Sequence, residues 1–241
     1  RWRWEKNGLG DRFILVNIPS FMAEVYAHDT LVLESRVIVG KPDHPTPRLT
    51  SVIQCFITYP YWHVPRKIAV DELLPAIKKD RGYIHRNNFD VLDRRGRILD
   101  PDTLDWGNFN KNNFPVTLRQ REGADNSLGV LKFSFDNPFA VFLHDTNARS
   151  LFQHETRAYS HGCIRMEKAI TFAHYLVTDD VHTKSPMLEK FLKEAKRHNV
   201  DLANPIAIHV RYITAEVKGE QLHLFDDVYN KDRAVIAKLY K

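Results

Sequence analysis

Hydrophobic and polar residues alternate along the first quarter of the chain, which predicts a series of β-strands. Phe13 to Ile18 and Met22 to Ala27 are short apolar runs, and Leu31 to Val39 alternates with a period of two. Ser51 to Thr58 is a fourth run, set apart from the third by Gly40 to Pro47, where three prolines and a glycine predict a loop. Short connections favour antiparallel sheets that pack face to face or curl.

The stretch from Tyr61 to Arg121 has a different character, because Lys, Arg, Asp and Asn replace the alternating pattern. Ala69, Leu73 and Ile77 form a short helical stripe, and Leu104–Trp106 offers an anchor for a small hydrophobic cluster. We interpret residues 61–121 as an inserted subdomain of helices and loops, separate from the sheet. The alternative is a solvent-exposed stretch of chain without a functional role.

The second half of the chain predicts further strands and two helices. Gly129 to Phe135 and Phe139 to Leu143 read as strands joined by an Asn137-Pro138 turn. Ser185-Pro186 is a typical helix start. Lys218-Gly219 predicts a turn towards Leu222 and Leu224. The stripes that indicate the two helices and a late strand are, in order, Ala169, Ile170, Ala173, Leu176, Val177; Met187, Leu188, Phe191, Leu192, Ala195; and Ile206, Ile208, Val210, Tyr212. The architecture predicted is mainly β (α+β), an antiparallel β-sandwich with peripheral helices and a helical insertion.

Length and composition are those of one domain with an insertion, since 241 residues at 43% hydrophobic content can bury a substantial core. The chain starts at Arg1 and shows no signal peptide, so we interpret residues 1–241 as part of a longer protein. No apolar run approaches the roughly 20 residues of a membrane-spanning helix. Arg1 to Trp4 alternates arginine with tryptophan, and packing against the domain is favoured there over a membrane contact.

The net charge of +5 is mild, and basic residues are interspersed with acidic ones. A nucleic-acid surface normally requires clustered basic residues, so we expect no nucleic-acid partner. The two cysteines are Cys55 and Cys163. Cys55 lies in a strand-like run and is interpreted as a core residue, and no disulfide is expected between the two.

The residues around Cys163 form a pattern that indicates a catalytic site. It lies in Ser160-His161-Gly162-Cys163-Ile164-Arg165, directly before a helical pattern. A thiol at the entrance of a helix tends to be acidic, and Gly162 would allow neighbouring amides to converge on one point. Such a point is an oxyanion site for acyl transfer.

A cysteine nucleophile needs a base, and the leading candidate is His144, which closes an apolar strand-like segment. His161 is a rival base. Arg165 offers a fixed cation for a substrate carboxylate. Two alternatives stay open: an inert buried cysteine, or a zinc site built from His144, His154, His161 and Cys163, although no metal-binding spacing is present.

His144-Asp145-Thr146 followed by Ser160 to Arg165 resembles the signature of L,D-transpeptidases with a YkuD-type catalytic domain. Arg12 to Pro19 is similar to the opening strand of that family. Four further segments resemble the larger, YcbB-like members, so that the resemblance covers about residues 11–232. Those segments are Tyr61–Pro65, Leu118–Gln120, Asp125–Gly129 and Phe225–Tyr229.

The resemblance implies a site. Cys163 would be the acylated nucleophile and His144 its base, oriented by the main-chain carbonyl of Asp145. Gly162 and Cys163 would supply oxyanion amides, while Ser160, His161 and Arg165 would shape the site and contact substrate. The insertion would be a cap over the active site. Asp145 departs from members that carry glycine after the histidine.

The resemblance also implies a function. Cys163 would attack the third residue of a peptidoglycan tetrapeptide stem, a diamino acid, and expel the terminal D-alanine. Transfer to an amine of another stem would give a 3–3 cross-link, without a cofactor, and carbapenems would acylate the cysteine. Export to the periplasm is implied, and any membrane attachment would come from upstream domains outside this sequence. Hydrolysis, attachment of a protein to the wall and a non-catalytic wall-binding domain are the alternatives.

Overall fold

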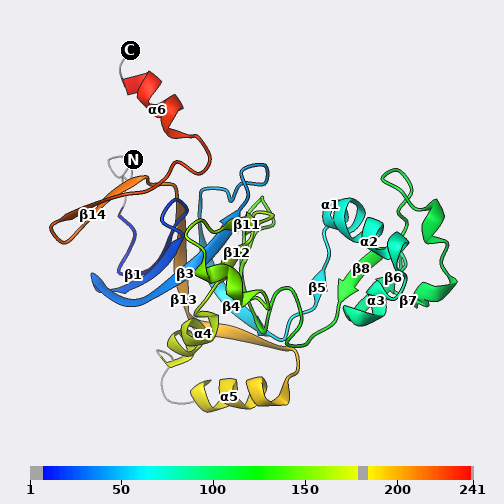
Figure 1. The fold of residues 1–241 in the computed structure, drawn as a ribbon. Coiled ribbons are helices and arrows are strands. Elements are labelled where there is room, and N and C mark those ends of the chain that lie inside the picture. The colour runs from blue at the N-terminus through cyan, green and yellow to red at the C-terminus, as the bar shows by residue number, and fades with distance from the viewer. Residues whose placement is uncertain (1–7, 179–183, 240–241) are drawn as a thin grey trace.

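The computed structural model describes residues 8–178 and 184–239. The described chain forms two regions: a large curled sheet and a smaller body that projects from one side of it (Figure 1). The interpretation of Arg1 to Trp4 lies outside the described residues. None of the helices in the two described ranges has the length and apolar character that a bilayer crossing requires.

Nine strands form the large sheet, in the order β11-β3-β12-β10-β9-β4-β13-β1-β2. β2 also pairs with β3, so the sheet closes on itself into a barrel. Closure removes the exposed backbone edges that an open sheet would leave. The strands are β1 Arg12–Asn17, β2 Met22–Ala27, β3 Thr30–Gly40, β4 Leu49–Thr58, β9 Leu131–Phe135, β10 Leu143–His144, β11 Ala158–Ser160, β12 Ile164–Met166 and β13 His198–Arg211.

The mainly β class predicted from the alternation is confirmed, but the pairing is mixed rather than wholly antiparallel. β1 with β13, β10 with β12, and β3 with β11 are parallel pairs. Each joins strands separated by a long stretch of chain, which is the connection that parallel pairing needs. The predicted strand Phe139 to Leu143 is wrong in its first part: Phe139 lies in a turn with 54% of its surface exposed, and β10 begins at Leu143.

The core of the barrel is built from the apolar residues that alternate with polar ones along each strand. In β9, Leu131, Phe133 and Phe135 point inward and are buried, whereas Lys132 and Ser134 face outward and are half-buried. Burying each such aromatic side chain stabilises the fold by about 1.5–3 kcal/mol. Phe172 of α4 (Ala169–Thr178) packs on Phe133 with ring centroids 5.0 Å apart. The predicted stripe therefore faces the core except at Ile170, which is 43% exposed, and Phe172 belongs to the buried face instead.

The remaining elements of the barrel region are peripheral. α5 (Lys184–Glu194) contacts α4, and the 3-10 helix η5 (Arg149–Gln153) precedes β11. α5 includes the predicted start at Pro186. The turn at Lys218-Gly219 joins β14 (Ala215–Lys218) to β15 (Gln221–Leu224), and α6 (Asp232–Leu239) follows.

The insertion, residues 61–121, has a hydrophobic cluster of its own around Trp106, which is 1% exposed. It is helical only in part, because a four-stranded antiparallel sheet, β5-β8-β6-β7, packs against its helices. Its elements are β5 Trp62–His63, α1 Arg66–Ile68, the π-helical turn η2 Ala69–Leu73, α2 Leu74–Lys79, α3 Tyr83–Arg86, β6 Phe89–Leu92, β7 Ile98–Leu99, η3 Pro101–Thr103, η4 Trp106–Asn108 and β8 Thr117–Gln120.

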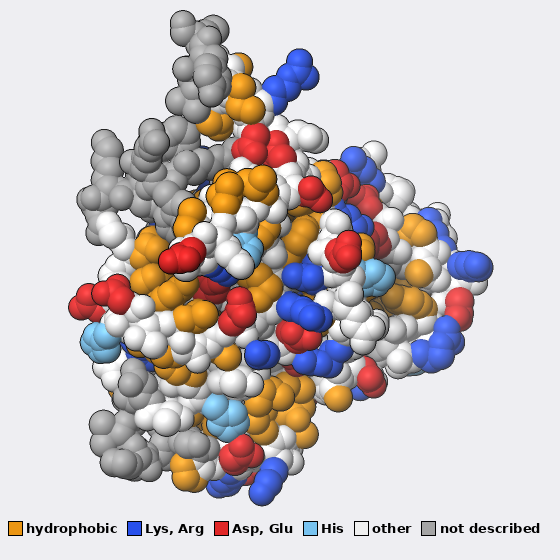
Figure 2. Space-filling view, turned by 60° about the vertical axis from the view of Figure 1, so that its left-hand side comes forward, with side chains coloured by type: hydrophobic (Ala, Val, Ile, Leu, Met, Phe, Trp, Pro, Cys, Tyr) orange, Lys and Arg blue, Asp and Glu red, His pale blue; other side chains and the backbone are white. Residues whose placement is uncertain are grey.

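One end of the barrel collects several loops. β4, β10 and β12 run in the same direction and begin there, whereas β3, β9 and β13 run the other way and end there. This end therefore carries residues 41–48, residues 136–142 and Cys163, together with the end of β13 at Arg211. On the face drawn in Figure 2, basic and acidic side chains are interspersed with hydrophobic ones.

Candidate active site

Three polar side chains form a row on the outer face of the barrel. In the sheet register, His144 of β10 lies opposite Lys132 of β9 and opposite Arg165 of β12. Their strand neighbours Leu143 and Ile164 point into the core and are fully buried. Because neighbouring residues of a strand face opposite sides, the register itself places the imidazole between the two cations.

His144 is held as a neutral base. Its side chain is 4% exposed, and Nδ1 lies 2.5 Å from the main-chain carbonyl of Asp145. A carbonyl oxygen only accepts, so we assign the ring proton to Nδ1, which makes Nε2 the nitrogen that can take a proton. Burial, and then the positive charge of Arg165, lowers the pKa of His144 from its ordinary 6.5 to about 3.

Cys163 does not lie at the entrance of a helix, so that prediction is wrong. β12 follows it directly, and α4 begins only at Ala169. Burial raises the pKa of the Cys163 thiol, which contradicts the acidic thiol expected at a helix start. A backbone hydrogen bond from Phe142 and the charges of Lys132 and Arg165 act in the opposite direction. The environment therefore supports a neutral thiol that becomes a thiolate when a base removes its proton.

Cys163 and His144 come from the ends of adjacent parallel strands, with Cys163 one residue before Ile164, the partner of Leu143. Within the two described ranges, no hydrogen bond joins the Cys163 sulfur to the His144 ring. Contacts between a nucleophile and its base are often loose without substrate and tighten in the complex. Cys55 and Cys163 are both free thiols.

The signature loop, residues 160–163, is fastened by hydroxyl groups. Ser160 Oγ donates to the Cys163 carbonyl at 2.5 Å and accepts from the Gly162 amide at 3.1 Å. Thr46 Oγ1 donates to the Gly162 carbonyl at 2.9 Å. Gly162 has a φ of +109°, which glycine alone adopts without strain.

These contacts change one predicted role. The Gly162 amide was expected to serve the oxyanion site, but it donates to Ser160 instead. In the part of the chain that the structure describes, the Cys163 amide has no hydrogen-bond partner. An oxyanion at this loop would therefore meet the Cys163 amide and the flanking cations rather than two adjacent loop amides.

Arg165 and Lys132 give the site its positive charge. Arg165 is half-buried, and among the described residues its buried Nε has no hydrogen-bond partner. An unpaired buried guanidinium is costly and is satisfied by an anion. Lys132 Nζ lies 4.2 Å from the centroid of the Phe142 ring, and burial lowers its pKa. Sequence reasoning missed Lys132, although the alternation from Leu131 to Phe135 already sets it opposite the core.

His161 faces the insertion. Its Nε2 lies 2.5 Å from a carboxylate oxygen of Glu72, in the π-helical turn η2, and its ring packs edge-on against His44 at 5.2 Å. Lys67 of α1 contacts His44 Nε2 at 2.8 Å. These contacts occupy His161 away from the row and give no support to it as a rival base. Glu72, Lys67 and His44 belong to no recognisable motif, so this junction could not be predicted from the sequence.

Asp145 acts through both its main chain and its side chain. Its carboxylate accepts hydrogen bonds from the Val130 amide at 3.0 Å and from Arg149 Nη1 at 2.9 Å. A Cβ at Gly129 would lie 2.3 Å from that carboxylate, so only glycine fits beside it. Asp145 thus fixes the segment that leads into β9 while its carbonyl orients the imidazole. In the described residues, no group of three or more His, Cys, Asp or Glu side chains is arranged to hold a metal ion.

Several known proteins are similar to this chain. A family model described as the L,D-transpeptidase catalytic domain, YkuD, matches residues 11–189. A protein of Haemophilus influenzae named as a putative L,D-transpeptidase is 34% identical over 222 residues, which are 92% of this chain and 45% of that protein. The chain thus spans less than half the length of this curated relative.

Among solved structures, an L,D-transpeptidase of Mycobacterium smegmatis is similar at 14% identity and a TM-score of 0.38, covering 83% of this chain and 58% of that one. L,D-transpeptidase 3 of Mycobacterium tuberculosis, solved with a faropenem-derived adduct, is 11% identical with a TM-score of 0.39, covering 83% and 60%. By the extent of the family-model match, this chain belongs to the YkuD family of L,D-transpeptidase catalytic domains.

Proposed function

We propose that this protein is a peptidoglycan L,D-transpeptidase with Cys163 as its nucleophile and His144 as its base. His144 Nε2 takes the thiol proton while the sulfur attacks the carbonyl of the third stem residue. A carbon–sulfur bond forms, the bond to the terminal D-alanine breaks, and the proton passes from His144 to the leaving amine. An amine of a second stem then attacks the thioester, forming an amide and returning a proton to the sulfur.

The observation that carries the proposal is the buried neutral imidazole between two cations, beside a thiol at the end of the adjacent strand. Burial and Arg165 keep the imidazole neutral before reaction, and the thiolate formed next to it would then stabilise the imidazolium as its counter-charge. Negative charge that develops on the sulfur or the carbonyl oxygen is offset by Lys132 and Arg165. Arg165 also suits a carboxylate of the donor stem, through a forked contact.

One thioester intermediate can react with three different acceptors, and each acceptor gives a different reaction. Transfer to a stem amine gives the 3–3 cross-link, transfer to water gives a carboxypeptidase, and transfer to a protein lysine attaches that protein to the wall. We place the enzyme in the periplasm, where its polymer substrate lies. The faropenem-derived adduct of the mycobacterial relative supports carbapenems and related β-lactams as acylating inhibitors of Cys163.

The insertion, in this proposal, is a cap beside the active site. It reaches the signature loop through Glu72 and His161, and its Lys67 contacts His44. A lid at this position would limit the access of water to the thioester, which favours transfer over hydrolysis.

The test is to incubate the protein with a disaccharide-tetrapeptide and to follow the products by mass spectrometry. A cross-linked dimer with release of D-alanine is expected. Tripeptide alone would establish hydrolysis, and unchanged substrate would leave only a wall-binding domain. Cys163→Ala is the control: it should release no D-alanine and form no adduct with meropenem. Full turnover by that variant would refute the nucleophile.

A further inference from the structure

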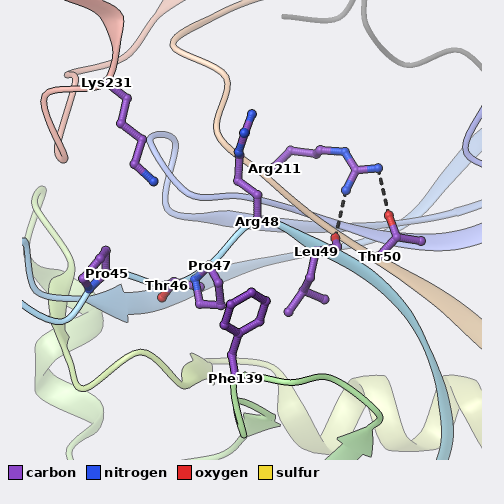
Figure 3. A pocket seen from close by; sticks show the side chains of 9 residues that line it. All are labelled: Pro45, Thr46, Pro47, Arg48, Leu49, Thr50, Phe139, Arg211 and Lys231. Atoms are coloured by element: carbon purple, nitrogen blue, oxygen red, sulfur yellow. Dashed lines mark hydrogen bonds between the residues drawn. The ribbon is translucent and has the colours of Figure 1, made fainter. Parts of the chain in front are cut away.

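A pocket of about 670 Å³, whose lining residues are drawn in Figure 3, lies at the end of the barrel where β4 begins and β13 ends. The signature loop is at the same end. Three cations line it: Arg48 before β4, Arg211 at the end of β13, and Lys231 before α6. None of its nine lining residues is acidic. The lining therefore carries three positive charges and no negative one, in a chain whose net charge is only +5.

Two of the cations are held in place. Arg211 donates to the Leu49 carbonyl at 2.8 Å and to Thr50 Oγ1 at 3.0 Å, and Figure 3 shows both contacts. Lys231 Nζ lies 5.3 Å and 5.4 Å from the ring centroids of Tyr212 and Tyr229. Restrained side chains lose less conformational entropy when they bind an anion, so these positions are preorganised.

The pocket also has an apolar side. Phe139 lies across from the cations in Figure 3, and 54% of its surface is exposed. An exposed aromatic ring beside three cations suits a ligand that combines carboxylates with carbon chains, as a peptide with acidic residues does. The volume lies within the roughly 300–1,000 Å³ of small-ligand pockets.

The pocket shares a wall with the active site. Thr46 lines it, and the hydroxyl of Thr46 holds the carbonyl of Gly162, the residue before the nucleophile. Phe139 belongs to the turn that leads to Phe142, whose backbone contacts the Cys163 sulfur. The 41–48 loop thus lines the pocket and contacts the residue before the nucleophile, so a peptide anchored in the pocket would extend along this loop towards Cys163.

We infer that this pocket binds the carboxylates of the acceptor stem and thereby positions its amine for attack on the thioester. The inference rests on the proposed function and extends it to the second substrate. Arg165, in the outer row, serves the donor stem, so the two stems meet different cations on the two sides of the signature loop.

The first experiment measures equilibrium binding without catalysis. The probe is a stem tripeptide that ends in the diamino acid, titrated into the Cys163→Ala protein by calorimetry. We expect R48E/K231E to raise its Kd by about tenfold or more, because attraction becomes repulsion at two positions. Arg94→Glu, at an exposed site of the insertion, makes the same type of charge change and should leave Kd unchanged. An unchanged Kd in the double variant would overturn the inference.

The second experiment separates the two half-reactions in the protein with Cys163 intact. Release of D-alanine reports acylation, and dimer formation at varied tripeptide concentration reports transfer. We expect R48E/K231E to raise the KM for the acceptor by about tenfold and to slow acylation much less. An equal loss in both steps would assign the pocket to the donor and overturn the inference. Absence of acylation in the parent protein would refute the proposed function, while the binding experiment would still test the pocket.

The binding of inorganic phosphate must be compared with that of the tripeptide, because a cluster of cations attracts any anion. Inorganic phosphate titrated under the same conditions should bind more weakly than the tripeptide, and Phe139→Ala should weaken only the tripeptide. Phosphate binding tighter than the tripeptide would overturn the assignment to a carboxylated peptide.

Discussion

The barrel and the insertion hold their functional side chains in different ways. In the barrel, the register of three adjacent strands places Lys132, His144 and Arg165 side by side. In the insertion, Glu72 reaches the signature loop from a single π-helical turn, on a body with a separate hydrophobic cluster. Strand register tolerates no partial displacement, whereas a body joined by a few polar contacts can move. We therefore expect barrel variants to abolish the chemistry and insertion variants to adjust it.

The largest effect should come from the base. His144→Gln keeps a polar side chain of similar size but cannot accept the thiol proton, so acylation should slow by about 10²–10⁴-fold. Stopped-flow acylation with meropenem measures the rate. The matched change in the insertion is His85→Gln, at an exposed histidine paired with Asp102, which should retain the full rate. A His144→Gln rate within twofold of the parent would remove this residue from the mechanism.

Core variants should separate the stability of the two regions. Trp106→Ala removes the buried centre of the insertion and should cost about 3–5 kcal/mol there, and Phe133→Ala should cost a similar amount in the barrel. Hydrogen exchange followed by mass spectrometry locates each loss. We expect Trp106→Ala to expose amides of residues 61–121 while the strands of the barrel stay protected. Loss of protection in both regions from either variant would show one cooperative unit instead.

Acid should weaken the barrel through His144. Its pKa in the folded protein is about 3, below the ordinary 6.5, so the unfolded chain binds a proton in this window that the folded chain does not. Stability from this group is complete above pH 6.5 and declines as pH falls, by about 3 kcal/mol between pH 7 and pH 4. Urea unfolding at both pH values should show a smaller decline in His144→Gln. Parallel declines in the two proteins would contradict the buried neutral ring.

Lys132 should have a smaller effect than the base. Its charge lowers the pKa of the Cys163 thiol, so Lys132→Met should raise that pKa and slow acylation by about tenfold. The rate of alkylation by iodoacetamide, followed against pH, should shift its rising limb to higher pH. Lys132→Arg should restore much of the charge effect. Ser134→Ala, on the same face of β9, is the control, and an unshifted profile in Lys132→Met would exclude an electrostatic role.

The strands and helices with a clear hydrophobic period could be predicted from the sequence, whereas the pairings and contacts between them mostly could not. Alternation over many residues located β1 to β4, and the helical stripe located α4. β12 has only three residues, too few to display a period, so the pattern beyond Cys163 looked like the start of a helix. Closure of the barrel by β2 and β3 depends on register between strands, which periodicity within one strand does not encode.

The same distinction between predictable and unpredictable features holds for the candidate active site. The signature motif singled out Cys163, His144 and Arg165, because residues that fill cores poorly are gathered there. It gave no sign of the Ser160 contact that takes up the Gly162 amide, since a loop's hydrogen bonds depend on its final dihedral angles. The junction of Glu72 with His161 joins positions far apart in the chain and is visible only in the folded molecule.

The smallest effect should come from that junction. Glu72 and His161 are partly exposed, so their contact contributes about 0–1 kcal/mol, and Glu72→Gln should leave the barrel as stable as before. The same change weakens a hold of the insertion on the signature loop, so hydrogen exchange around residues 66–79 should rise. If the insertion limits water, the ratio of tripeptide to dimer should rise as well, with acylation by meropenem unchanged. Glu122→Gln, outside the junction, provides the control. An unchanged product ratio despite faster exchange would mean that the insertion moves without governing the fate of the thioester.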